Sequence, residues 1–326
     1  MHFRTERFAV DSRETARKPI KLRKPRRIEP FIERVDSSVS GRPHTAKMMD
    51  SLDTLLGNGH SRPHPAPKVL VLFGTRPELI KLAPVIAELR KQKCRPLVVS
   101  SSQHKGLLAP FLKDLNVEVD IDLDVMKTDQ TPNDVLSNVI AGLDRILVAE
   151  TPDVVLVQGD TTTTLAGALA AFNRKIPVGH VEAGLRSGDI TSPFPEEANR
   201  RLITQIAAFH FAATEQNRQN LLDDGVAERQ IFVTGNTVVD SLNAMLDRLR
   251  VSDEITDLIA DTAGQRRILL TTHRRESFGD AMSRNLEVLA RFVERHDDVS
   301  LTFPVHPNPN VRAATEAILE IGRAHV

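Results

Sequence analysis

The stretch from residue 68 to residue 91 reads KVLVLFGTRPELIKLAPVIAELRK, and it decides the fold. Residues 69–73 are a short, unbroken apolar run, which is typical of a parallel strand buried on both faces. Gly74 permits a tight turn, and Pro77 suits the first position of a helix. The amphipathic run of residues 79–90 therefore predicts a helix that packs back over the strand.

The same alternation of short apolar runs and longer amphipathic runs continues along the chain. We expect further strands at residues 96–100, 117–123, 154–158, 178–181, 209–212 and 231–234. We expect helices at residues 106–115, 133–150, 165–173, 196–208, 216–224 and 238–249. This pattern predicts an α/β fold, with a doubly wound, Rossmann-like domain over residues 68–250.

A second domain is expected to begin after residues 251–265, which are polar and irregular enough to form a linker. The alternation then restarts with two strands and two helices, expected at residues 267–271, 281–296, 300–305 and 311–321. Two strands are too few for a doubly wound domain. We therefore expect residues 251–326 to hold a linker and the first part of a second Rossmann-like domain, incomplete in this chain.

Residues 1–67 differ in composition from the rest of the chain. They hold 14 Lys and Arg against 8 Asp and Glu and have no apolar periodicity, whereas the whole chain balances 43 basic against 43 acidic residues. Such a segment cannot bury enough apolar surface to offset its chain entropy, so we expect a basic, disordered extension. No aromatic side chains interleave the basic cluster at residues 17–27, and this disfavours a nucleic-acid or membrane-surface patch.

The composition also excludes several classes of protein. Cys94 is the only cysteine, which rules out a disulfide framework and disfavours a cysteine-based zinc site. No apolar run approaches the length needed to span a bilayer, and the first residues lack the apolar core of a signal peptide. We therefore expect a cytoplasmic protein.

Polar side chains gather where the predicted strands end and helices begin, which is where open α/β sheets bind ligands. Arg76 and Lys81 follow the first strand, and they either bind an anion at the helix N-terminus or are solvated surface cations. Asp160 follows the strand at residues 154–158. Because Thr161 and Thr162 can already cap the next helix, Asp160 is a candidate acid, base or electrostatic stabiliser.

Residues 180–186 read HVEAGLR and contribute a second carboxylate. His180 and Glu182 lie two residues apart at a strand end, so their side chains should point the same way. No clear third ligand accompanies them, and we therefore expect no metal site here.

Residues 195–201 read PEEANRR at the start of a predicted helix. Glu196 and Arg200 lie four residues apart on one helical face, as do Glu197 and Arg201. Exposed salt bridges would explain both pairs without any function.

Two histidines close strands of the second domain, His273 and His306. Together with Arg274 and Arg275, they indicate a nucleotide or phosphate site. The chain has neither a G-x-G-x-x-G nor a Walker A run, so the dinucleotide and P-loop fingerprints are missing. No Ser or Cys lies in a nucleophile-elbow context.

Five motifs in this order resemble the non-hydrolysing UDP-N-acetylglucosamine 2-epimerases: GTRPE at 74–78, GDTTT at 159–163, HVEAGLR at 180–186, PEEANR at 195–200 and HRRE at 273–276. The resemblance runs from about residue 68 to about residue 312. It implies two Rossmann-like domains facing each other across a cleft, as in GT-B glycosyltransferases. It also implies interconversion of UDP-GlcNAc and UDP-ManNAc for bacterial surface polysaccharide precursors. The family's reaction is an anti elimination of UDP to a glycal, followed by re-addition of UDP.

The resemblance also implies site residues and partners. The catalytic residues would be Asp160, Glu182, Glu196 and His273. The substrate-binding residues would be Arg76, Lys81, Arg186, Arg200, Arg274 and Glu276. A second, allosteric UDP-GlcNAc would contact Gln103, His104 and His306. The partners would be UDP-GlcNAc and UDP-ManNAc, with no cofactor, no metal, no nucleic acid and no membrane, in a homodimer when the chain is full length.

Part of the family pattern is missing, because the family's UDP-gripping Ser-Gly-Gly loop and paired glutamates have no match in this sequence. We therefore expect a C-terminally truncated member that is a poor enzyme by itself. A GT-B glycosyltransferase and an inactive UDP-sugar-binding fragment are the alternatives.

Overall fold

The structure, a computed structural model, describes most of the chain from residue 66 onward. The described residues are 43–48, 66–92, 94–102, 105–125, 127, 130–248, 251–272, 279–305 and 308–319, with the backbone alone for 105–107 and 310. The chain divides into two compact units, Met1–Ser241 and Leu242–Val326. The predicted end of the first domain, near residue 250, lies further along the chain than this division.

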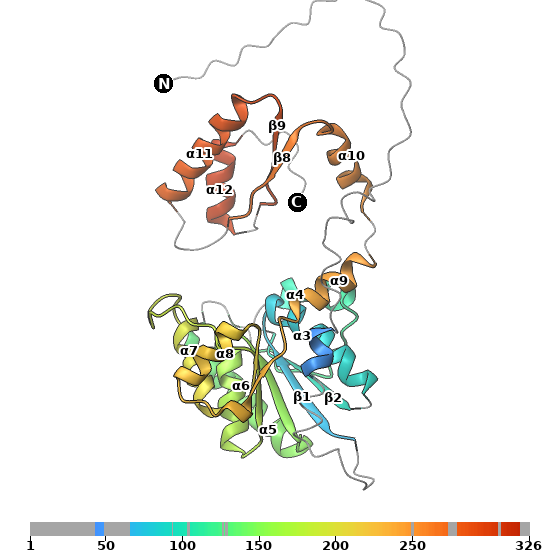
Figure 1. The fold of residues 1–326 in the computed structure, drawn as a ribbon, viewed down its shortest axis with the longest axis vertical. Coiled ribbons are helices and arrows are strands. Elements are labelled where there is room, and N and C mark those ends of the chain that lie inside the picture. The colour runs from blue at the N-terminus through green and yellow to red at the C-terminus, as the bar shows by residue number, and fades with distance from the viewer. Residues whose placement is uncertain are drawn as a thin grey trace, which may run out of the picture. The chain divides into compact units, whose positions relative to one another are not determined.

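Unit 1 is built on a seven-stranded parallel sheet with the order β3-β2-β1-β4-β5-β6-β7 (Figure 1). The strands are β1 (Lys68–Phe73), β2 (Arg95–Ser100), β3 (Ile121–Asp122), β4 (Val154–Gln158), β5 (Val178–Ala183), β6 (Phe209–Ala212) and β7 (Ile231–Val233). Because β1 lies beside β4, the chain winds outward in both directions from that pair. The predicted α/β, doubly wound fold is confirmed for this unit, and the pair β1–β4 marks its topological switch point.

Helices alternate with these strands. They are α3 (Arg76–Lys91), α4 (Lys105–Asp114), α5 (Pro132–Glu150), α6 (Thr162–Asn173), α7 (Glu196–Ile206), α8 (Glu215–Asp223) and α9 (Val238–Leu246), with a 3-10 turn η1 (Glu228–Gln230). The division between the units falls within α9.

Both faces of the sheet are buried, as the unbroken apolar strands predict. Successive side chains of a strand point to opposite faces. Val69 and Val71 of β1 therefore join one apolar cluster with residues of α3, while Leu70 and Leu72 join another with residues of α5 and α6. The carboxyl ends of the strands are then the places where polar side chains can gather.

The predicted strand at residues 117–123 is shorter than expected, since only Ile121–Asp122 pairs with β2. The carboxylate of Asp120 accepts a hydrogen bond from the backbone amide of Val98 at 2.7 Å. A side chain thus takes a donor that a longer strand would have paired, and Val117 packs instead into the apolar cluster of α3.

The predicted disordered extension is wrong for one segment, because residues 44–48 are helical. Met48 of this segment is fully buried in the cluster of β1 and α3. The other calls on residues 1–65 lie outside the described residues.

Unit 2 consists of α10 (Asp253–Asp261), β8 (Arg266–Leu269), α11 (Asp280–Glu294), β9 (Val299–Thr302) and α12 (Pro309–Ile318). β8 and β9 pair in parallel, and α11 and α12 pack together through Met282, Leu286 and Val311. The predicted irregular linker is wrong, because α10 occupies it. Ser252 caps this helix by accepting a hydrogen bond from the amide of Ile255, a signal that the polar composition concealed.

Across the described ranges of both units, no helix is long and apolar enough to cross a membrane.

Candidate active site

Two turns at the switch point are joined by one buried carboxylate, that of Glu78. It accepts hydrogen bonds from the amides of Gly74 and Thr75 at 2.9 and 2.6 Å, in the turn after β1. It also accepts bonds from the hydroxyls of Thr161 and Thr164 at 2.7 and 2.9 Å, in the turn after β4. The carboxylate of Glu78 therefore links the GTRPE and GDTTT segments at the carboxyl ends of β1 and β4.

The carboxylate of Glu182, at the end of β5, accepts hydrogen bonds from three side chains. Its Oε2 accepts from Lys81 Nζ and from Gln158 Nε2, both at 2.5 Å, and its Oε1 accepts from Asn236 Nδ2 at 2.7 Å. These contacts place the negative charge of Glu182 in a fixed position and orientation.

The backbone of Glu182 is also unusual, with φ of 66° at a register shift between β5 and β6. A non-glycine residue in this left-handed region costs about 1 kcal/mol or more, and such residues cluster at functional sites. The sheet therefore pays an energetic cost to aim this carboxylate.

Asp160, after β4, lies in a different electrostatic environment. Burial raises the pKa of its carboxyl, Arg200 and Lys81 oppose the rise, and the nearby charges of Glu196 and Glu182 add to it, so that the pKa is about 6. Arg200 Nη1 lies 3.3 Å from its Oδ2. The structure thus brings Asp160 within electrostatic reach of both Glu182 and Glu196, and the carboxyl of Asp160 can exchange a proton near neutral pH.

The peptide that carries Asp160 is fixed from two sides. Nε2 of His180 donates to the carbonyl oxygen of Gly159 at 2.7 Å, and Nδ2 of Asn199 donates to the carbonyl oxygen of Asp160 at 2.9 Å. His180 is fully buried, and burial lowers its pKa to about 4, so the ring is neutral at pH 7. Because a carbonyl can only accept, the proton of the neutral ring resides on Nε2. His180 is therefore a support for the peptide that carries Asp160.

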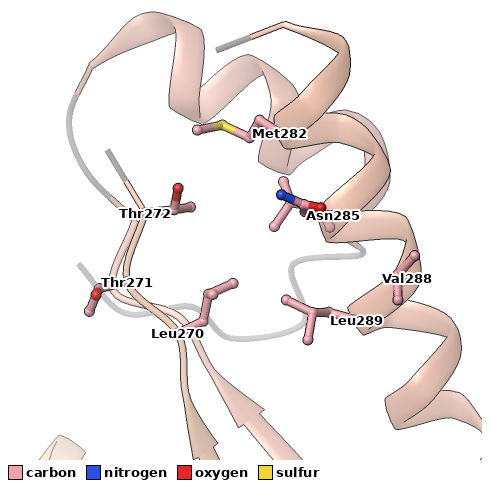
Figure 2. A pocket seen from close by; sticks show the side chains of 8 residues that line it. Leu270, Thr271, Thr272, Met282, Asn285, Val288 and Leu289 are labelled. Atoms are coloured by element: carbon pink, nitrogen blue, oxygen red, sulfur yellow. The ribbon is translucent and has the colours of Figure 1, made fainter. Parts of the chain in front are cut away.

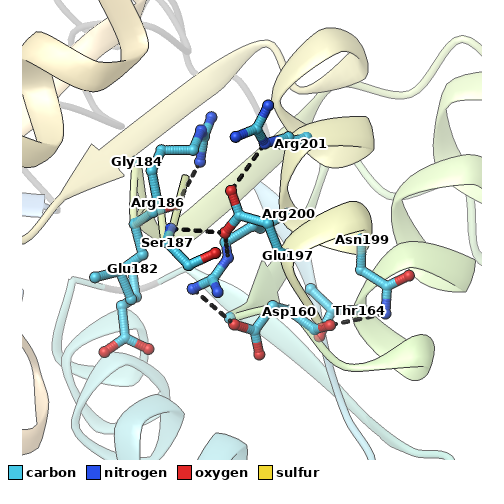
Figure 3. Close-up of polar contacts among 12 residues, drawn as sticks. Asp160, Thr164, Glu182, Gly184, Arg186, Ser187, Glu197, Asn199, Arg200 and Arg201 are labelled. Atoms are coloured by element: carbon cyan, nitrogen blue, oxygen red, sulfur yellow. Dashed lines mark hydrogen bonds and ion pairs between the residues drawn. The ribbon is translucent and has the colours of Figure 1, made fainter. Parts of the chain in front are cut away.

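Of the two salt bridges predicted at the start of α7, the pair Glu197–Arg201 is confirmed, but its carboxylate is buried rather than exposed. Glu197 is fully buried, and its carboxylate lies 2.8 Å from Nε of both Arg200 and Arg201 and accepts from the amide of Ser187 at 3.0 Å (Figure 3). Arg200 therefore bridges Glu197 and Asp160, whereas the spacing had paired it with Glu196. Burial works to raise the pKa of Glu197, but the Ser187 amide and the two arginines outweigh it and hold the pKa below its usual range.

Two other predicted substrate ligands are placed differently. Arg76 is exposed at the first residue of α3, and its guanidinium carbon lies 5.2 Å from the ring centroid of Phe111. Arg186 is committed within the protein, since its Nη2 lies 2.5 Å from Oδ2 of Asp224 and 2.9 Å from Oγ1 of Thr204. Arg76 thus remains open to a ligand, and Arg186 ties the end of β5 to α7 and α8.

Six predicted site residues lie outside the described residues: Gln103, His104, His273, Arg274, Glu276 and His306. Unit 2 nevertheless has a hollow of about 460 Å³ (Figure 2), and three of its lining residues directly precede His273 in the sequence. It lies between the end of β8 and α11 and is lined by apolar side chains together with Thr271, Thr272 and Asn285. Within the part of the chain that the structure describes, no cluster of three His, Cys, Asp or Glu could hold a metal ion.

Comparisons with known proteins show to which family the chain belongs. The sequence model of the UDP-N-acetylglucosamine 2-epimerase family matches residues 87–326. The chain belongs to the UDP-N-acetylglucosamine 2-epimerase family.

Individual relatives extend this finding. A UDP-N-acetylglucosamine 2-epimerase of Escherichia coli strain K12 is 46% identical over 258 residues, which cover 77% of this chain and 69% of the relative. The crystal structure of UDP-GlcNAc 2-epimerase from Neisseria meningitidis, bound to UDP-GlcNAc, is 40% identical with a TM-score of 0.72, over 79% of this chain and 70% of that one. The enzyme of Methanocaldococcus jannaschii, in complex with UDP-GlcNAc and UDP, is 33% identical with a TM-score of 0.63, over 77% and 68%.

Sequence reasoning missed five supporting residues of this epimerase-family site: Glu78, Gln158, Glu197, Asn199 and Asn236. Glu78 and Glu197 lie inside motifs that were singled out, but a buried carboxylate cannot be told from an exposed one by its spacing. Gln158 ends a wholly apolar strand, and a polar residue at that position was an available signal. Asn236 offered none, since its contact with Glu182 joins residues far apart in sequence.

Proposed function

We propose that this chain interconverts UDP-GlcNAc and UDP-ManNAc by inverting carbon 2 of the sugar. The substrate class is supported by membership of the family and by the UDP-GlcNAc bound to the Neisseria meningitidis relative. The chemistry is supported by one observation above all, the contrast between a proton-exchanging Asp160 and a fixed, charged Glu182 at the same edge of the sheet.

The reaction explains why acidic groups of different kinds are needed. The hydrogen on carbon 2 is not adjacent to a carbonyl, so its direct removal is too difficult. Elimination of UDP across carbons 1 and 2 gives a glycal, which is then protonated at carbon 2 from the other face before UDP adds back. This sequence requires proton carriers, stabilisation of positive charge at carbon 1, and cations near the diphosphate.

Asp160 and Glu196 are the proton carriers in this proposal. A carboxyl with a pKa of about 6 can both take and return a proton near neutral pH. Glu196 lies in the first turn of α7, and its charge raises the pKa of Asp160. Arg200 keeps Asp160 oriented, and His180 and Asn199 keep its peptide in place.

Glu182 supplies fixed negative charge near carbon 1. Each of its oxygens already accepts a hydrogen bond, and Lys81 pairs with it, so it is less suited to take a proton than Asp160. A preorganised anion stabilises developing positive charge without any reorganisation during the reaction.

Arg76 would contact the diphosphate beside the N-terminus of α3, where anions are favoured. In unit 2, we propose that His273, Arg274 and Glu276 contact UDP. A binding role for that region is supported by the hollow that the residues directly before His273 line. Gln103, His104 and His306 would bind a second, allosteric UDP-GlcNAc. We further propose a cytoplasmic homodimer that serves surface polysaccharide synthesis.

The test is to incubate the protein with UDP-GlcNAc alone in heavy water and to follow carbon 2 by NMR. Two proteins are compared: the 326-residue chain, and a completed chain extended to the length of the Escherichia coli relative with that relative's own sequence. We expect the completed chain to form UDP-ManNAc with deuterium at carbon 2. A requirement for an acceptor would indicate a glycosyltransferase, and binding of UDP-GlcNAc without exchange in the completed chain would overturn the proposal.

A further inference from the structure

The short helix at residues 44–48 is part of unit 1, although it precedes residue 87, where the family match begins. Met48 is fully buried in the apolar cluster of α3 and β1, and Thr45 is 4% exposed. Figure 1 draws this helix in blue, beside α3. Burial of Met48 anchors a segment whose sequence otherwise resembles a polar tail.

The polar contacts of this helix are made with the start of α9 and the loop before it. Asp240 accepts from the amides of His44 and Thr45, at 3.2 and 2.9 Å, and so satisfies two of the unpaired donors at the N-terminus of the short helix. Nδ1 of His44 donates to the carbonyl oxygen of Thr234 at 2.9 Å.

The same loop, residues 234–237, contacts the candidate active site from its other side. Nδ2 of Asn236 donates to Oε1 of Glu182 at 2.7 Å, while its Oδ1 accepts from the amide of Val238 at 3.0 Å. Oγ1 of Thr237 donates to the carbonyl oxygen of Lys81 at 2.7 Å. The loop thus contacts both members of the Lys81–Glu182 ion pair.

Gly235 brings the two sides of the loop close together. Its φ is 87°, and a Cβ added there would lie 1.9 Å from Nδ1 of His44. The imidazole therefore lies directly against the backbone of the residue before Asn236. Only glycine permits both the left-handed backbone and this approach.

We infer that residues 43–48 are a strap that holds residues 234–237 and, through Asn236, positions the carboxylate of Glu182. The inference rests on the proposed function of Glu182. If the segment served only to fill the core, burial of Met48 would be enough. Its N-terminal residues also bond to the loop and to α9, through His44 with Thr234 and through the amides that Asp240 accepts from. His44 and Asn236 are positioning residues, since neither is placed on the substrate.

A double-mutant cycle tests this coupling in the completed chain. Asn236→Ala should lower kcat about tenfold with KM within about twofold, because Glu182 loses a donor and its orientation. His44→Ala should lower kcat about threefold in the same direction. The double variant should be no slower than Asn236→Ala, since both changes act through one contact.

Two further variants separate positioning from loss of folding. His44→Asn keeps a donor near the position of Nδ1 and should restore most of the activity. Pro43→Ala, at an exposed residue of the same segment that keeps its carbonyl oxygen, should leave kcat unchanged. Multiplicative effects in the double variant, or a His44→Ala protein with a lower Tm and an unchanged kcat, would overturn the inference.

Hydrogen exchange of the substrate-free 326-residue chain distinguishes this inference from the proposed function. His44→Ala should speed amide exchange in residues 234–238 several-fold and leave β1 unchanged. Faster loop exchange in the His44→Ala variant, together with a completed chain that shows no epimerase activity, would overturn the proposed function and keep the strap. Unchanged loop exchange would overturn the strap, whatever the activity; if His44→Ala does not fold, Asp240→Asn takes its place.

Discussion

The ends of β4 and β5 carry the same kind of side chain in opposite environments. Asp160, after β4, is half-buried beside two other carboxylates with one arginine 3.3 Å away, and its pKa rises to about 6. Glu182, at the end of β5, is held by Lys81, Gln158 and Asn236. The two carboxyls lie at the same edge of the sheet, and their neighbours, more than their residue type, fit Asp160 for proton transfer and Glu182 for charge stabilisation.

The strongest test of this division replaces Asp160. Asp160→Asn keeps the shape and removes the titrating proton, so kcat of the completed chain should fall about 10³-fold, within the range measured for general acids and bases. Deuterium incorporation at carbon 2 measures the loss. A variant that keeps a tenth of the activity would show that Asp160 carries no essential proton.

Replacing Glu182 should have the next largest effect. Glu182→Gln keeps hydrogen-bonding capacity but removes the charge that pairs with Lys81, and kcat should fall about 10²-fold as electrostatic stabilisation is lost. The pH dependence of the remaining activity should keep one inflection, shifted below pH 6, because Asp160 is unchanged but the charge of Glu182 that raises its pKa is gone. Disappearance of that inflection in Glu182→Gln would mean that the two roles are reversed.

His180 tests whether the support beneath Asp160 matters. His180→Leu removes the donor to the carbonyl oxygen of Gly159 and should destabilise the protein by about 1–3 kcal/mol, as for other buried acceptors left unpaired. His180→Gln can still donate and should recover part of that loss. Equal thermal unfolding curves for the two variants would show that the hydrogen bond contributes nothing.

The smallest effect on activity is expected at Arg186. Arg186→Lys loses the paired contacts with Asp224 and Thr204 and should destabilise unit 1 by about 1 kcal/mol, with kcat and KM within about twofold of the unchanged protein. Thermal unfolding and steady-state kinetics measure both. A rise in KM of tenfold or more would place Arg186 on the substrate, as the family resemblance implies.

The fold could be predicted from the sequence because the central strands β1 and β4 are short apolar runs, each followed by a turn. The positions of Asp160 and Glu182 followed from the same rule, since parallel strands end at one edge. The role of each carboxylate could not be predicted from the sequence, because it depends on contacts with residues distant in the chain. Arg200 contacts Asp160, and Gln158 and Asn236 bond to Glu182.

Two local predictions failed for different reasons. The helix at residues 44–48 buries a single apolar side chain, that of Met48, and one buried residue gives no periodic pattern. The α10 helix has Ile255, Leu258 and Ile259 at helical spacing and a cap at Ser252, but the polar composition around them suggested a linker. A tertiary contact decided the first segment, and local signals that composition concealed decided the second.

The most direct measurement is an NMR titration of the aspartate side-chain carboxyls in the ¹³C-labelled 326-residue chain. We expect one aspartate carboxyl with a pKa of about 6, protonated below that pH and charged above it, whose signal is absent from Asp160→Asn. This result does not depend on turnover. If the signal assigned to Asp160 instead titrates near the ordinary value of about 4, Asp160 is not the proton carrier and the division of roles between β4 and β5 is wrong.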